Sequence, residues 1–192
     1  MSRRFFLFGC IICFAVVINP VLFAGGKALN PDTVYGSSPG TPVECNGVLF
    51  FSAYSEKNGE ELWKSDGTEA GTVMVKNINP NGDSMPSRLT AVGNTLYFSA
   101  TDGTNGIELW KSDGTEAGTV MVKDIEPSGN SSPMYLTAVG STLFFRAQES
   151  TYGIELWKSD GTDAGTVLVK DINTSGNASV QELTAMGSTL YF

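Results

Sequence analysis

Short apolar stretches separated by turn residues recur along most of this chain. Between positions 87 and 133, four such stretches occupy residues 88–92, 95–101, 107–111 and 119–125. Short apolar runs bounded by Gly, Asn and Asp predict β-strands. No long segment after residue 24 lacks Gly or turn residues, so no helix is predicted there. The pattern therefore predicts an all-β protein.

The predicted strand at residues 107–111 carries apolar side chains on both faces. Successive side chains of a strand point to opposite faces of its sheet. Ile107 and Leu109 therefore share one face, and Trp110 lies on the other. Such a strand needs cover on both sides, which favours sheets stacked face to face over a sandwich with one wet face.

A long string repeats along the chain in a fixed register. Residues 61–72 read Glu-Leu-Trp-Lys-Ser-Asp-Gly-Thr-Glu-Ala-Gly-Thr, residues 108–119 repeat them unchanged, and residues 155–166 repeat them with one Glu replaced by Asp163. A Leu-aromatic-Phe triplet keeps the same spacing of 47 residues, at positions 49–51, 96–98, 143–145 and 190–192. Four strands in a unit of about 40 to 50 residues are typical of a β-propeller blade.

The N-terminal segment has the parts of a secretory signal peptide. Residues 1–24 contain Arg3 and Arg4, an apolar stretch at 5–18, a proline at position 20 and a small residue, Ala24, at the expected cleavage point. An uncleaved membrane anchor is the alternative, because residues 5–24 just reach the roughly 20 residues that a spanning helix needs. The proline favours cleavage. We therefore expect a secreted or cell-surface protein, with a linker at 25–42 and a repeat segment at 43–192.

Composition removes several classes of protein. The chain has 12 Lys and Arg against 20 Asp and Glu, a formal net charge of -8, and no His. An acidic chain is not expected to bind nucleic acid, and nothing but the export signal predicts contact with a membrane. The lack of His excludes Ser-His-Asp and Cys-His nucleophile systems and zinc sites that need imidazole. Loss of the leader would leave Cys45 alone, without a partner for an intrachain disulfide.

The repeated string at residues 61–68, 108–115 and 155–162 resembles the signature of the bacterial ELWxxDGT repeat family. The resemblance covers roughly residues 43–192. It implies an exported, propeller-like protein of tandem units, and it brings no catalytic residues. Three complete blades and a half blade predict an incomplete chain, an N-terminal fragment of a longer protein. Ring closure between chains, which would make a homo-oligomer, is the alternative.

One tryptophan in each unit is a candidate for stacking against a sugar ring: Trp63, Trp110 and Trp157. A tryptophan that recurs at a fixed strand position is more typical of packing between blades. We therefore expect a structural role for these residues. The same role is expected for the turn glycines Gly67, Gly114 and Gly161, which supply positive φ angles.

The Asp-Gly-Thr turns begin at Asp66, Asp113 and Asp160, which are the candidate calcium ligands of the chain. Calcium takes six to eight oxygen ligands, and one turn offers two carboxylates with carbonyls and hydroxyls. The favoured interpretation is that the aspartate shapes its turn by accepting backbone N–H bonds. No cofactor is therefore expected. Lysines beside the tryptophans and after the fourth strands are expected to be solvated edge charges: Lys64, Lys76, Lys111, Lys123, Lys158 and Lys170.

These patterns predict a non-catalytic scaffold or recognition surface at the cell envelope or outside the cell. Residues 77–87, 126–133 and 173–180 form connections that differ between units while the strands do not. Variable loops on a constant frame are typical of recognition, here of a protein or carbohydrate ligand. The alternative is a carbohydrate-active or calcium-dependent propeller enzyme, with its catalytic groups in these loops or in sequence beyond position 192. No catalytic residue is assigned.

Overall fold

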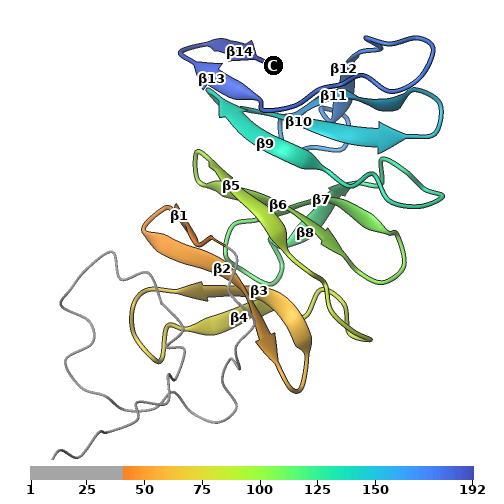
Figure 1. The fold of residues 1–192 in the computed structure, drawn as a ribbon. Coiled ribbons are helices and arrows are strands. Elements are labelled where there is room, and N and C mark those ends of the chain that lie inside the picture. Colours follow the sequence, from red (N-terminus) through yellow and green to blue (C-terminus); the bar gives the residue numbers. More distant parts are fainter. Residues whose placement is uncertain (1–40) are drawn as a thin grey trace, which may run out of the picture.

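The computed structural model describes residues 41–192, and these residues contain β-strands and no helix. They form three four-stranded antiparallel sheets and one two-stranded sheet (Figure 1). The first sheet holds β1 (Val43–Cys45), β2 (Val48–Ser55), β3 (Gly59–Ser65) and β4 (Val73–Lys76). The second holds β5 (Ser87–Val92), β6 (Thr95–Thr101), β7 (Ile107–Ser112) and β8 (Val120–Lys123). The third holds β9 (Met134–Val139), β10 (Thr142–Glu149), β11 (Gly153–Ser159) and β12 (Val167–Lys170), and the two-stranded sheet holds β13 (Thr184–Met186) and β14 (Thr189–Tyr191).

The strand pattern confirms the all-β prediction, and one predicted strand is shorter than expected. The fourth strand of the second unit was predicted at residues 119–125, and β8 spans Val120–Lys123. Thr119 instead bonds the turn before it, because its Oγ1 donates to the Thr115 carbonyl at 2.7 Å. The Ile125 N–H donates to the Glu108 carboxylate at 3.0 Å, so this N–H does not bond the neighbouring strand.

Each four-stranded sheet follows chain order, and the sheets meet along their first strands. Strand β5 contacts β1 and β9, and β9 contacts β13, while β4, β8 and β12 form the opposite edges (Figure 1). Hydroxyls tie neighbouring first strands together, since Thr90 Oγ1 donates to the Leu136 carbonyl and Thr137 Oγ1 to the Leu183 carbonyl. Every sheet of the described residues is open, and none closes on itself.

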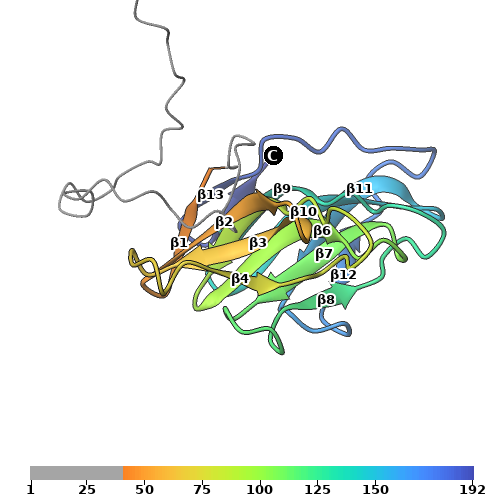
Figure 2. The same ribbon diagram turned by 90° about the horizontal axis from the view of Figure 1, so that it is seen from below.

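The core lies between the sheets, which lie one behind another when seen from below (Figure 2). Phe98 and Trp110 of the second sheet belong to one buried cluster with Phe50 of the first sheet. Leu109 of the second sheet belongs to another, with Phe145 and other residues of the third. The second sheet is therefore covered on both faces, as the alternation of its apolar residues predicts.

The antiparallel order places the connections at two opposite ends of the stack. Turns β1–β2 and β3–β4, with their equivalents in later units, lie at one end, which we call the constant rim. Turns β2–β3, the connections between units and the starts of the first strands lie at the other end, which we call the variable rim. The repeated Asp-Gly-Thr turns all belong to the constant rim.

Candidate functional site

The glutamate of the repeated string is buried in every unit. Glu61, Glu108 and Glu155 each have a relative exposure of 0%. The Glu108 carboxylate accepts hydrogen bonds from the backbone N–H of Ile125 at 3.0 Å and of Ser131 at 2.9 Å. It also accepts one from the Ser131 hydroxyl. Burial raises the pKa of Glu61 and of Glu108 above the ordinary value, although these hydrogen bonds oppose the rise.

This carboxylate holds the connection between units against the third strand. In the third unit, Ala178 stands where Ser131 stands in the second, and Glu155 accepts only backbone N–H bonds, from Ile172 at 3.0 Å and Ala178 at 3.1 Å. Sequence analysis missed this role. The available signal was a strictly repeated acidic residue beside apolar ones, at a fixed spacing from each connection.

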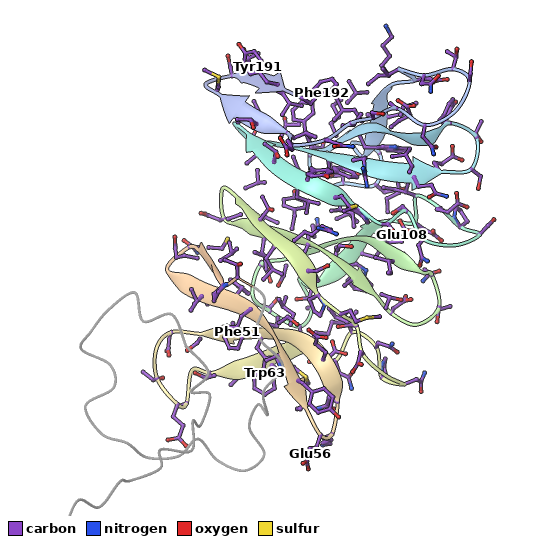
Figure 3. The ribbon with its side chains drawn as sticks, in the orientation of Figure 1. Phe51, Glu56, Trp63, Glu108, Tyr191 and Phe192 are labelled. Atoms are coloured by element: carbon purple, nitrogen blue, oxygen red, sulfur yellow. The ribbon has the colours of Figure 1, made fainter. Side chains whose placement is uncertain are left out.

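The three tryptophans are buried. Trp63, Trp110 and Trp157 are 9%, 6% and 6% exposed. Trp110 belongs to the cluster between the first and second sheets, and Trp157 to the cluster between the second and third. Trp63 and Phe51 lie on the first sheet (Figure 3). Rings buried to this extent offer no face on which a sugar could stack.

The Asp-Gly-Thr turns bond identically in the three units. Asp113 Oδ1 accepts from the Thr115 N–H at 2.8 Å and from the Thr115 hydroxyl at 2.7 Å. Asp66 and Asp160 make the same two bonds with Thr68 and Thr162. These bonds lower the pKa of each aspartate, with the threonine hydroxyl as the main cause.

The glycine in each turn has the backbone conformation that this hydrogen-bonding arrangement needs. The same arrangement leaves few oxygen ligands in the turn for a cation. Gly67, Gly114 and Gly161 have φ angles of 89°, 87° and 90°, in the left-handed region that favours glycine. One oxygen of each aspartate is already engaged within its own turn. Among residues 41–192, no group of three Asp, Glu, Cys or His side chains could hold a metal ion.

The expectation that the repeated lysines are solvated edge charges is wrong for at least three of them. Lys64 Nζ donates to the Gly114 carbonyl at 2.8 Å, and Lys111 Nζ donates to the Gly161 carbonyl at 2.7 Å. Lys76 Nζ donates to the Thr119 carbonyl at 2.8 Å. In each case the lysine reaches from one sheet to a carbonyl of the next, because stacking brings the neighbouring turn within reach.

A cavity of about 60 Å³ lies at the constant rim between the first two sheets. Cys45, Phe50, Lys64, Asp113 and Gly114 line it. Burial raises the pKa of the Cys45 thiol, so the thiolate is disfavoured there. The cavity holds little more than one or two water molecules.

The backbone of the variable rim is held by the same hydrogen bond in all three units. An Asp or Asn of each connection accepts the backbone N–H at the start of the third strand. The distances are 2.8 Å for Asp83 with Glu60, 2.7 Å for Asn130 with Ile107 and 2.9 Å for Asn177 with Ile154. Neighbouring units are also linked, since Ser150 Oγ donates to the Glu126 carboxylate at 2.6 Å. The bases of the connections are therefore fixed.

Different side chains project from this shared frame. Tyr54, Met85 and Tyr152 are 38%, 50% and 43% exposed on the variable rim. Glu56 lies at the tip of the turn between β2 and β3 (Figure 3). The second unit has other side chains at these positions: Thr101 for Tyr54, Ser132 for Met85, Asn105 for Tyr152 and Gly103 for Glu56. The candidate functional site is this rim, a constant backbone that carries unlike side chains.

The comparisons with known proteins add no assignment: no family model, no curated protein and no solved structure matches this chain. Among the described residues, no helix is long and apolar enough to cross a membrane. The predicted signal peptide at 1–24, and the linker up to residue 40, lie outside the residues that the structure describes.

Proposed function

We propose that this chain is an exported, non-catalytic repeat protein that uses the variable rim as a recognition surface at the cell envelope or outside the cell. Its stacked sheets would be blades of a propeller. Adjacent first strands and apolar cover on both faces support this proposal. The resemblance of the repeated string to the ELWxxDGT repeat family supports both the fold and the export.

The contrast between the two rims is the observation that carries the proposal. On the constant rim, every unit has the same Asp-Gly-Thr turn with the same hydrogen bonds. On the variable rim the backbone bonds recur, yet the exposed side chains change from unit to unit. A frame that is kept while its exposed positions differ is typical of a recognition surface.

A pair of variants that exchange residues between units tests the proposal. The variable-rim variant carries Tyr54→Thr, Met85→Ser and Tyr152→Asn, each residue being the one at the equivalent position of the second unit. The control is the constant-rim variant Glu69→Asp, Glu116→Asp and Asp163→Glu, in which each residue is replaced by the one at the equivalent position of another unit. Binding of each protein is measured on a glycan array and on intact source cells.

We expect the unchanged chain and the constant-rim variant to bind alike, and the variable-rim variant to lose at least 10-fold in affinity. Thermal melts check that both variants fold. Equal losses in the two variants, or no binding to either array or cells, would contradict the proposal. Cleavage of a bound glycan would favour the carbohydrate-active enzyme instead.

A further inference from the structure

The indole N–H of each repeated tryptophan is a buried donor without an acceptor. Nε1 of Trp63, Trp110 and Trp157 makes no hydrogen bond within residues 41–192, and each residue is at least nine-tenths buried. Trp110 packs against the first sheet and Trp157 against the second, so both lie inside the described stack. Buried polar groups in native proteins are nearly always hydrogen-bonded, so the same unmet donor in three units calls for a partner.

Each unit also buries an acceptor without a donor. The oxygen Oδ1 of Asn77, Asp124 and Asp171 accepts no hydrogen bond from the part of the chain that the structure describes. These residues are 47 positions apart and directly follow β4, β8 and β12, where the connection to the next unit starts. Asn77 donates from Nδ2 to Asn58 Oδ1 at 3.3 Å, so its oxygen is the atom left over. The three units therefore share an acceptor oxygen and not a charge.

A repeated β-bulge turns this acceptor toward the tryptophan. On β8, Met121 lies opposite Trp110. Lys123 lies opposite the preceding residue of β7, which leaves Val122 as an extra residue. Side chains alternate along a strand, so Asp124 would lie on the other face without the bulge and shares the face of Trp110 with it. The same shift recurs at the equivalent positions of the first and third units.

The buried Glu108 shows that Asp124 lies close to this face. Glu108 and Trp110 are two residues apart on β7 and therefore share a face. Burial raises the pKa of Glu108, and the charge of Asp124 adds to the rise, which requires the two carboxylates to be near each other. The Glu108 carboxylate already accepts three hydrogen bonds, from Ile125 and Ser131. Among the described residues, only Asp124 of this pair leaves a buried oxygen without a donor.

We propose that one internal water molecule in each unit joins the tryptophan to the Asp or Asn that follows the fourth strand. The water oxygen accepts from the indole N–H, and one water hydrogen goes to Oδ1. Water fits because it is both acceptor and donor, and because an internal water needs at least two polar partners. In the second unit it ties Trp110 of β7 to Asp124, where the connection to the variable rim starts. The inference does not depend on the proposed function.

An ion would match the site less well than water. A cation would take the oxygen of Asp124 and leave the indole N–H unpaired, and Asn77 offers it no charge in the first unit. An anion would accept from the indole N–H and be repelled by the carboxylates of Asp124 and Glu108. A neutral molecule with both a donor and an acceptor therefore suits all three units.

NMR of the full chain with isotope-labelled tryptophans tests for this water. Transfer of magnetisation from water to each indole N–H is measured in the laboratory and rotating frames, which separates a long-lived bound water from proton exchange. Asp124→Asn keeps the acceptor oxygen and copies the first unit, whereas Asp124→Leu keeps the branched shape and removes the acceptor. Trp110→Phe identifies the Trp110 signal, and Trp157 serves as an internal control in every variant.

We expect a bound-water signal on Trp110 and Trp157 in the unchanged chain. Asp124→Asn should keep the signal on Trp110, and Asp124→Leu should lose it while Trp157 keeps its own. The lack of any bound-water signal in the unchanged chain, or a Trp110 signal that survives in Asp124→Leu, would overturn the proposal.

A high-resolution crystal structure of the unchanged chain gives a second readout that needs no variant. It should place a water oxygen within hydrogen-bonding distance of both Trp110 Nε1 and Asp124 Oδ1. A direct bond between these two atoms, or an ion in place of the water, would contradict the inference even if the variants failed to fold.

Discussion

The glutamate in the repeated string shows how a residue can follow the strand pattern and still have a role that the pattern does not reveal. In the sequence, Glu108 stands between Ile107 and Leu109. In the fold it is fully buried and accepts backbone N–H groups from positions 17 and 23 residues further on. The carboxylate satisfies N–H groups of the connection that would otherwise be buried without a partner.

Replacement of this carboxylate by an amide should destabilise the fold. Glu108→Gln places an NH₂ donor against a buried N–H donor, and we expect a loss of about 1 to 3 kcal/mol in the free energy of unfolding. Glu116→Gln, at an exposed residue of the constant rim, should change it by less than about 0.5 kcal/mol. Urea unfolding of both variants measures the difference. Equal values for the two variants would show that the Glu108 bonds contribute nothing.

The turn aspartate should make stability depend on pH in a defined direction. Hydrogen bonds from Thr115 hold the pKa of Asp113 below its ordinary value of 3.8. Its contribution is therefore complete above pH 3.8 and is lost as the pH falls through the lower, folded-state pKa. Asn keeps the acceptor oxygen and removes the charge. Asp113→Asn should cost less than about 1 kcal/mol at pH 7, because the group is solvent-screened.

The free-energy difference between the unchanged chain and Asp113→Asn should shrink between pH 7 and pH 3. Urea unfolding at several pH values gives this difference directly. A difference that stays constant, or that grows in acid, would mean that the pKa of Asp113 is not lowered by folding.

At the scale of the elements, the lysines connect one sheet to the next. Lys111 at the end of the third strand donates to the Gly161 carbonyl in the turn of the following unit. The equivalent Lys158 is exposed and has no recorded acceptor among the described residues. Among the described residues, Lys111 therefore reaches an acceptor in the following unit and Lys158 does not.

This pair of lysines gives a matched test of contacts between sheets. Lys111→Met keeps the aliphatic stem, removes the donor and should lower the free energy of unfolding by about 1 kcal/mol. Lys158→Met should leave it within about 0.5 kcal/mol of the unchanged chain. Thermal and urea unfolding measure both. If Lys158→Met were the more costly change, the Lys111 bond would not be what joins these sheets.

For the molecule as a whole, the predicted leader would decide where the exported chain begins. We expect cleavage after Ala24, which removes Arg3 and Arg4 and takes the formal net charge of -8 to about -10. Intact mass spectrometry of the chain isolated from its source cells reads the new N-terminus. A mass that begins at Met1 would instead support a retained membrane anchor. A parallel native measurement distinguishes a single chain from a homo-oligomer.

The sequence by itself determined the strands, their 47-residue period and the apolar cover that both faces of each sheet require. These features are local, because strand alternation and turn chemistry act over a few neighbouring residues. The strands predicted at residues 88–92 and 95–101, for example, are β5 and β6, which pair as a hairpin. The signal peptide and the ELWxxDGT resemblance also come from the sequence alone and stay predictions.

Only the tertiary structure decided which side chains meet across units. The bond from Lys64 Nζ to the Gly114 carbonyl spans 50 residues, and the bond from the Ser131 N–H to the Glu108 carboxylate spans 23. The contact of Arg146 with Tyr135 needs β9 and β10 to pair in one register. Such contacts depend on how sheets stack and strands align, which no local pattern of hydrophobic and polar residues specifies.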